Sequence, residues 1–125
     1  MLGSKDVVTT IPVKDLEKAK QFYSETLGLT QLGDDEQDHV MYKAGSSQVL
    51  VYESEYAGTN KATAATWPVG EDIEREVQTL KSKGVSFEHY DMPGTSVKGD
   101  LHVMGDMKAA WFKDPDGNIL ALVSR

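Results

Sequence analysis

The sequence predicts an α+β fold made of two tandem copies of one βαβββ module. Two repeats predict it: Pro12-Val13 recurs as Pro68-Val69 and Gly28 recurs as Gly84, both 56 residues further along the chain. A stretch with the apolar spacing of a helix lies between the two repeats in each half. The same order of features, found twice, indicates an internal duplication.

Module one is expected at about residues 6–55. Its first strand is predicted over residues 7–13, which are rich in β-branched side chains. Asp15 suits the N-cap of the helix that follows, and Gly28 suits its C-terminal end. The remaining predicted strands, the last two of them joined as a hairpin, are residues 29–32, 40–44 and 48–53.

Module two is expected at residues 63–125, after a linker of small and polar residues at about 56–62. Its first strand is predicted over residues 63–69. Asp72 is expected to cap the second helix and Gly84 to end it. A Pro- and Gly-containing loop is predicted over residues 91–99, and the remaining strands are predicted at residues 85–89, 101–104, 108–112 and 118–123. Residues 1–125 then form a single domain.

Composition limits the possible functions. The chain has 125 residues, 20 acidic against 13 basic, and a net charge of −7. Nucleic-acid binding needs a basic surface, so we expect no nucleic-acid partner. No apolar run is long enough to span a bilayer, so no membrane partner is expected. The chain has no cysteine, which removes thiol chemistry, and a cytoplasmic location is expected.

Two motifs resemble a known family. Residues 11–23 read Ile-Pro-Val-Lys-Asp-Leu-Glu-Lys-Ala-Lys-Gln-Phe-Tyr and are followed by Leu27-Gly28-Leu29. They resemble the opening module of the vicinal-oxygen-chelate superfamily, which includes glyoxalases, bleomycin-resistance proteins and extradiol dioxygenases. Residues 111–120, with Asp114-Pro115-Asp116-Gly117-Asn118, resemble its closing hairpin. The resemblance implies a curved mixed sheet around a cleft, helices outside, and a homodimer.

The resemblance also implies where metal ligands would stand. By the family pattern the first ligand lies seven residues before the capping Asp, and the last lies four residues after the Gly of the closing hairpin. In this chain the four positions are Val8, about Val51, Ala65 and Ala121. None of these side chains has a donor atom for a divalent metal. We therefore expect no metal, no cofactor and none of the metal-dependent chemistry of the family.

The two tryptophans are the main candidates for ligand binding. Strand alternation places Trp67 on the same face as Ala65, and the resemblance implies that Trp111 points into the cleft. Small neighbours, Val8, Ala65 and Ala121, leave room for a flat ligand. The alternative is that both tryptophans only fill the core. Thr10 and Glu53, predicted to share the cleft-facing parity of Val8 and Val51, are candidate polar anchors. For Glu53 the alternative is a surface charge.

The three histidines, His39, His89 and His102, lack the spacing of a local metal motif. A metal site built from His89, His102 and nearby Asp residues is an alternative to surface or loop positions. His102 precedes the penultimate strand, where an imidazole can act as a general base or bind a ligand. The Asp114–Asn118 run suggests a calcium motif, but Asp-Pro-Asp-Gly is also ordinary turn chemistry.

Three functions follow from these observations. The first is a metal-independent protein, similar to the bleomycin-resistance branch, that binds a small apolar or aromatic molecule in the cleft between modules. The second is a lyase or isomerase that uses Glu53 or His102 as its acid or base. The third is a scaffold with a vestigial pocket.

Overall fold

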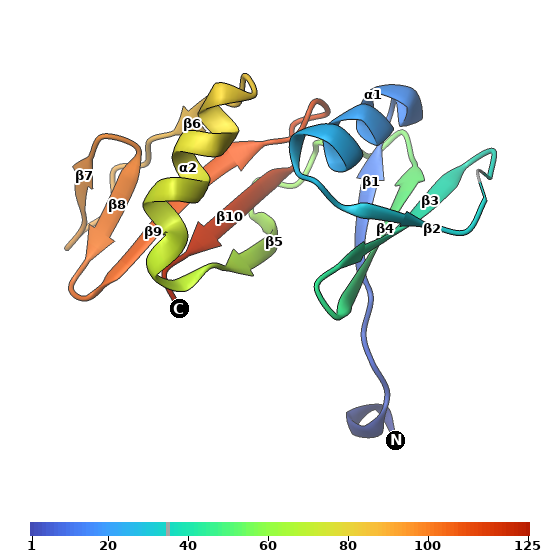
Figure 1. Ribbon diagram of the computed structural model, residues 1–125, viewed down its shortest axis with the longest axis horizontal. Coiled ribbons are helices and arrows are strands. Elements are labelled where there is room, and N and C mark those ends of the chain that lie inside the picture. The colour runs from blue at the N-terminus through green and yellow to red at the C-terminus, as the bar shows by residue number, and fades with distance from the viewer. Residues whose placement is uncertain (35) are drawn as a thin grey trace.

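The structure is a computed structural model that describes residues 1–34 and 36–125, and it confirms the α+β fold with two modules (Figure 1). Module one contains β1 (Thr9–Val13), α1 (Leu16–Gln21), β2 (Thr30–Leu32), β3 (His39–Ala44) and β4 (Ser47–Glu53). Module two contains β5 (Thr63–Pro68), α2 (Ile73–Ser82), β6 (Phe87–Glu88), β7 (Ser96–Lys98), β8 (Leu101–Met104), β9 (Met107–Lys113) and β10 (Ile119–Val123).

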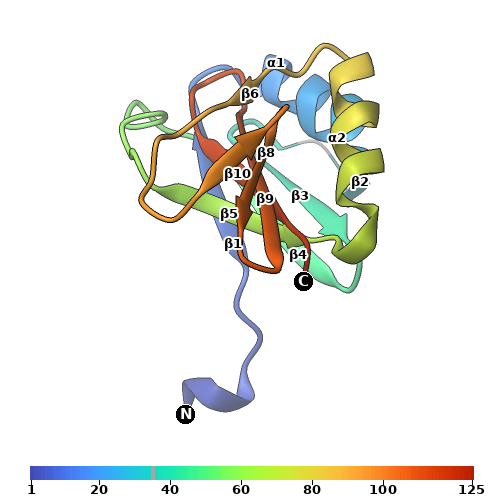
Figure 2. The same ribbon diagram turned by 90° about the vertical axis from the view of Figure 1, so that its left-hand side faces the viewer.

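The strands of the described residues form two sheets, one for each module. In module one the order is β1-β4-β3-β2, and β1 runs parallel to β4. In module two the order is β5-β10-β9-β8-β7, with β5 parallel to β10 and the short β6 pairing with β9. Each sheet is therefore mixed and has the first strand of its module at one edge. Each helix lies on the outer side of its own sheet (Figures 1 and 2).

The predicted loop over residues 91–99 is wrong in part, because it contains β7. This strand pairs antiparallel with β8, and all three of its residues are exposed. An exposed strand has no buried face, so its sequence carries no alternation of apolar and polar residues. The predicted strand over residues 85–89 is shorter than expected and comprises only Phe87–Glu88.

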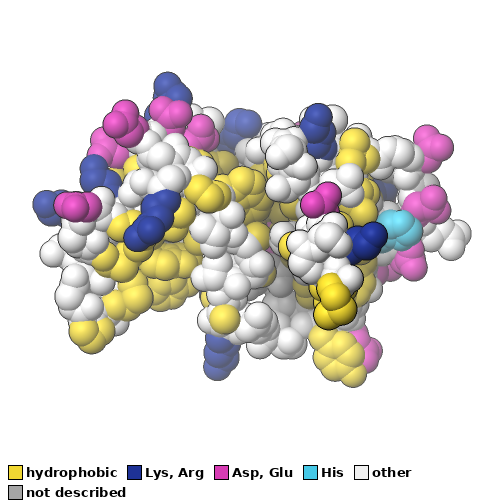
Figure 3. Space-filling model, turned by 90° about the horizontal axis from the view of Figure 1, so that it is seen from below, with side chains coloured by type: hydrophobic (Ala, Val, Ile, Leu, Met, Phe, Trp, Pro, Cys, Tyr) yellow, Lys and Arg dark blue, Asp and Glu magenta, His cyan; other side chains and the backbone are white. Residues whose placement is uncertain are grey.

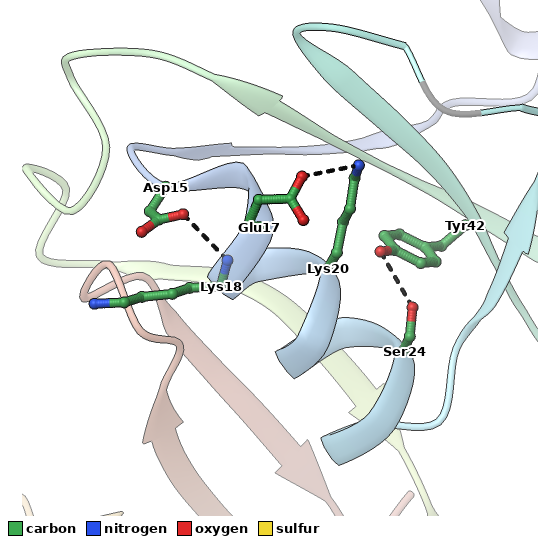
Figure 4. Close-up of polar contacts among 6 residues, drawn as sticks. All are labelled: Asp15, Glu17, Lys18, Lys20, Ser24 and Tyr42. Atoms are coloured by element: carbon green, nitrogen blue, oxygen red, sulfur yellow. Dashed lines mark hydrogen bonds and ion pairs between the residues drawn. The ribbon is translucent and has the colours of Figure 1, made fainter.

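Helix α1 begins where the sequence predicts. The Asp15 carboxylate accepts a hydrogen bond from the Lys18 backbone N–H at 3.2 Å, which caps the helix (Figure 4). Its last turn widens into a π-helical turn (Phe22–Thr26), in which the Leu27 N–H donates to the Phe22 carbonyl at 2.9 Å. Gly28, at φ +77°, then reverses the chain. The apolar spacing does not distinguish this π turn from continued α-helix.

Helix α2 begins differently. Asp72 stands at the N-cap as predicted, but its side chain makes no capping hydrogen bond and instead pairs with Arg75 at 2.8 Å. A 3₁₀ turn (Gly70–Asp72) separates β5 from the helix. Val69 repeats Val13 at the offset of 56, whereas Asp72 repeats Asp15 at 57. Module two therefore has one extra residue between its first strand and its helix.

A buried carboxylate joins the two modules. Asp114, at the end of β9, accepts a hydrogen bond from the buried Tyr23 hydroxyl at 2.8 Å. The side-chain amide of Asn118 donates to the same oxygen at 2.8 Å and to the Pro12 carbonyl at 2.7 Å. The other carboxylate oxygen accepts the backbone N–H groups of Asp116 at 3.0 Å and Asn118 at 2.8 Å. The Asp114–Asn118 run is thus a turn, and it also ties the β9–β10 hairpin to module one.

The linker between modules packs closely on this hairpin. Gly58 has φ +74°, and a Cβ atom at that position would collide with the backbone carbonyl of Asp116. Only glycine meets both conditions, because it tolerates positive φ and has no side chain. Ala57 beside it is buried.

Replacing Tyr23 by Phe tests the junction. The variant leaves the buried Asp114 carboxylate without one of its donors, so we expect the free energy of unfolding to fall by roughly 1–3 kcal/mol. Urea denaturation followed by tryptophan fluorescence measures it. Tyr56→Phe is the matched control, since Tyr56 is 70% exposed. Equal stabilities of Tyr23→Phe and the wild type would contradict the assigned role.

The stability difference between the wild type and Tyr23→Phe should shrink at alkaline pH. Burial, and then the negative charge of Asp114, raise the pKa of Tyr23 above its ordinary value. The unfolded chain releases this proton near pH 10, at about the ordinary tyrosine pKa, while the native chain keeps it. Stability contributed by Tyr23 is therefore lost as pH rises above about 10, by up to about 1.4 kcal/mol per pH unit. The wild type should lose its advantage over Tyr23→Phe in this range.

Candidate functional site

The face of each sheet that its helix leaves uncovered is the candidate site. In module one Ile11 and Val13 of β1 are buried in the core with α1, so Thr10, the residue before Ile11, points to the opposite side. In module two Leu120 and Leu122 of β10 are buried in the core, and Ala121 between them points away from it. We call these uncovered sides the open faces. Hydrophobic side chains reach the surface on both halves of the molecule when it is seen from below (Figure 3).

The open face of module two holds Trp111. On β9 this residue pairs in register with Ala121, whereas Phe112 pairs with the core residue Leu120. The structure therefore places Trp111 and Ala121 together. The Trp111 ring is half-buried, and its Nε1–H donates to the Thr63 hydroxyl at 3.2 Å.

Trp67 and Ala65 do not lie on this face. Ala65 pairs with Leu120 and Trp67 with Leu122, so both share the core side of the sheet. The prediction that Trp67 lies opposite Trp111 is wrong. It took Ala65 as the repeat of Val8 from its distance to Asp72, and that distance includes the extra residue of module two. Counting from Val69 instead places the repeat of Val8 at Ala64, beside a β-bulge.

Val51 and Glu53 also lie on a different face from the one predicted. Val51 pairs with Ile11 in β1, and both are fully buried against α1. Glu53 has the same strand parity as Val51 and lines a surface hollow near the start of α1 with Asp15 and Glu17. Val8 and Val51 were predicted to face the same side of the sheet. Val51 instead faces the core, and the neighbouring residue Leu50 shares the side of Thr10. The open-face residues of β4 are Leu50 and Tyr52.

Thr10 and Val8 remain at the open face of module one. Thr10 is exposed, and its hydroxyl donates to the Val8 carbonyl at 3.2 Å. Val8 is half-buried just before β1. The Thr10 hydroxyl therefore already has a hydrogen-bond partner within its own strand segment.

The inherited metal positions do not fit a metal. Val8, Val51, Ala65 and Ala121 have no donor atoms, and Ala64, the corrected repeat of Val8, has none either. Nor do three or more His, Asp or Glu side chains converge anywhere within residues 1–34 and 36–125.

The alternative histidine site is not assembled. His89 Nε2 lies 2.9 Å from Asp100, whose other oxygen binds Lys81 at 2.7 Å. Hydrogen bonds from Lys81, and then from His89, lower the pKa of Asp100. His102 instead accepts the backbone N–H of Tyr90 on its Nε2 at 2.9 Å. The two imidazoles thus have separate partners.

Three rings form an aromatic cluster on the open face of module two. His102 of β8 pairs in register with Ala109, two residues before Trp111, so the two rings share one side. Their centroids lie 4.8 Å apart in an edge-on arrangement, and Tyr90 lies 5.6 Å from Trp111. Tyr90 was missed by the sequence reading because residues 89–95 have no strand alternation to orient it. Tyr90, His102 and Trp111 are called the aromatic cluster below.

The two candidate acid–base residues are not brought together. Glu53 belongs to module one and lies on the α1 side of its sheet, whereas His102 belongs to the open face of module two. Among the described contacts, no hydrogen bond joins the two side chains. A hollow of about 620 Å³ lies on the helix side, between Phe22 and Lys83, and touches neither residue.

The comparisons identify the family. The family model for the Glyoxalase/Bleomycin resistance protein/Dioxygenase superfamily matches residues 7–122. The chain belongs to this superfamily. A search of curated proteins found no match.

Solved structures show the same fold. A glyoxalase family protein from Enterococcus faecalis is 22% identical with a TM-score of 0.74, covering 98% of this chain and 99% of that one. An integron cassette protein from the Halifax Harbour sewage outfall is 24% identical with a TM-score of 0.72, covering 97% and 99%. The fosfomycin resistance protein FosX from Listeria monocytogenes is 16% identical with a TM-score of 0.72, covering 98% and 91%. At these identities the likeness establishes the fold alone. No described helix is both long and apolar enough to cross a membrane.

Loss of the donor atoms leads to a prediction about metal content. We expect the purified protein to hold no stoichiometric Ni, Zn, Fe or Mn at the inherited positions, because alkyl side chains cannot coordinate them. Elemental analysis after dialysis measures it, and the melting temperature should be the same with and without a chelator. A stoichiometric metal that is lost when Val8 or Ala121 is replaced would contradict this prediction.

Proposed function

We propose that this superfamily member is a metal-independent binding protein for a small, flat, apolar or aromatic organic molecule. The observation that supports it is the position of Trp111, a half-exposed indole on a sheet face that no helix covers. Its neighbour Ala121 stands where the family pattern has a metal ligand, so the position offers no coordination. The cytoplasmic location expected from the sequence remains part of this proposal.

The expected affinity is modest. Burying roughly 100 Å² of apolar ligand surface contributes about 2.5 kcal/mol at about 25 cal/mol per Å². An aromatic contact with Trp111 adds about 0.5–1.5 kcal/mol. The two contributions sum to about 3–4 kcal/mol, and association also costs translational and side-chain entropy. Binding no tighter than about millimolar is therefore expected without a well-placed hydrogen bond or a larger buried area.

We propose further that the protein is a homodimer whose second copy helps to enclose the ligand. Strands β1 and β5 each have a hydrogen-bonded neighbour on one side only, and such edges favour further pairing. The open faces of both modules also carry apolar residues, including Leu50, Met41 and Val123. A second copy that pairs with these edges and packs on the apolar residues of the open faces would enclose the cleft between modules.

The second function, an acid–base lyase or isomerase, is favoured by one observation only. His102 is buried beside Trp111, and its Nε2 is occupied by the Tyr90 N–H. A neutral imidazole then carries its proton on Nδ1, which makes His102 a proton donor to a ligand. Glu53 has no comparable support, since it lies on the α1 side.

The two tryptophans form a matched pair for testing the binding proposal. A panel of planar aromatic compounds is screened by tryptophan fluorescence and thermal shift against Trp67→Phe and Trp111→Phe. We expect hits to change the emission of Trp67→Phe, which keeps Trp111. Trp111→Phe should give little response and weaker binding, by roughly three- to tenfold. If no compound perturbs the wild type, or if both variants respond alike, the proposal is wrong.

The dimer is tested by light scattering. The mass in solution at micromolar concentration should be twice the 13.7 kDa of one chain. Replacing Thr10 with Pro removes a backbone N–H from the β1 edge and should shift the protein towards the monomer. A wild-type mass of one chain would contradict the proposal.

A further inference from the structure

The aromatic cluster contains two buried polar atoms that have no hydrogen-bond partner among the described residues. They are Nδ1 of His102 and the hydroxyl oxygen of Tyr90. His102 is 0% exposed, and the two ring centroids lie 6.0 Å apart. Buried polar atoms in native proteins are nearly always paired, so two unpaired ones in adjacent rings call for an explanation.

Both atoms are hydrogen-bond donors at neutral pH. His102 accepts the Tyr90 N–H on Nε2, so the proton of the neutral ring is on Nδ1. Burial, and then the charge of Glu88, raise the pKa of Tyr90, which keeps its hydroxyl protonated. A donor sealed from water without an acceptor is costly, and an acceptor supplied by a ligand removes that cost.

We propose that the Nδ1–H of His102 and the O–H of Tyr90 are the polar anchor of the ligand site, and that they bind a neutral carbonyl oxygen of a flat ring packed on Trp111. The three side chains are already in mutual contact, with Trp111 at 4.8 Å from His102 and 5.6 Å from Tyr90. This inference rests on the proposed function, because it names the polar group of the molecule held at the same open face.

The charges around the cluster favour a neutral acceptor over a carboxylate. Glu88 pairs in register with Trp111 and so shares its side of the sheet. The Lys113 ammonium lies 3.6 Å from Glu88 and offsets that charge rather than adding a free cation. The chain as a whole carries −7. An anionic ligand would meet repulsion here, whereas a ketone, amide or lactam oxygen would not.

Access requires a side chain to move, because both donor atoms are sealed from solvent. Tyr90 is suited to this movement. It is the second residue after the end of β6, and the segment from 91 to 95 that comes after it belongs to no strand or helix. Its backbone is fixed through the N–H bonded to His102, so the ring can rotate while the backbone stays in place.

The experiment compares three probes on the full chain: methyl β-naphthyl ketone, β-isopropylnaphthalene and β-naphthoate. The first two have the same ring system and similar shape, but only the ketone has a carbonyl oxygen. Equilibrium dialysis gives the dissociation constants. We expect the ketone to bind roughly five- to tenfold more tightly than the hydrocarbon, the effect of a net hydrogen bond, and more tightly than the carboxylate.

Two variants remove the donors one at a time. Tyr90→Phe keeps the ring, and His102→Gln keeps a polar group to accept the Tyr90 N–H while removing Nδ1–H. Each should lose the preference for the ketone and keep the affinity for the hydrocarbon. Tyr56→Phe, an exposed tyrosine, is the control and should match the wild type. The melting temperature of Tyr90→Phe should stay level or rise, because it removes an unpaired buried hydroxyl.

The outcomes separate this inference from the proposed function. If both naphthalenes bind equally, if the variants keep the ketone preference, or if the carboxylate binds best, the inference is overturned and the binding proposal stands. A clear fall in the melting temperature of Tyr90→Phe would also overturn it, by showing that the hydroxyl has a partner within the protein. If neither naphthalene binds the wild type, this inference is overturned, and the binding proposal falls as well if the whole aromatic panel gives no response.

Discussion

Asp114 is only 4% exposed, and a carboxylate in such a place is costly unless it is paired. Four donors surround it: the Tyr23 hydroxyl, the Asn118 amide and two backbone N–H groups of its own turn. Because Tyr23 comes from module one and the turn from module two, one buried group sets the position of one module against the other. The packing of Phe22 on Phe112, with ring centroids 6.5 Å apart, depends on the same junction.

This junction also determines which surfaces remain available for binding. Helix α1 and the β9–β10 hairpin occupy the contact between modules, so the core sides of both sheets are filled. The candidate site is on the opposite side of the strands, where Trp111, Ala121 and the His102 ring lie. The candidate site is therefore a consequence of strand parity: each residue that packs the core has a neighbour that faces away from it.

Sequence patterns predicted the fold, but they did not predict correctly which face of each strand packs into the core. The repeat of Pro12-Val13 and Gly28, with the two family motifs, predicted both modules and nearly all of the strands. Trp67 and Val51 lie on the other side from the one predicted because a shift of one residue inverts a strand. For Trp67 the shift comes from the 3₁₀ turn (Gly70–Asp72), whose only sign in the sequence is the offset of 57 between Asp15 and Asp72 where the other repeats have 56. Tyr90 lies outside any periodic segment, so only the tertiary structure shows that it meets His102.

The close packing of Gly58 on the Asp116 carbonyl has a consequence for how this chain can evolve and assemble. In a protein made of two duplicated modules, copies can exchange modules when the connecting segment swings free. Here the segment lies against the hairpin turn, and pulling it away would also disturb the turn that holds the buried Asp114. Exchanging modules between two copies would therefore disrupt the packing of the connecting segment that has to act as the hinge. The packing therefore favours a unit in which both modules come from one copy.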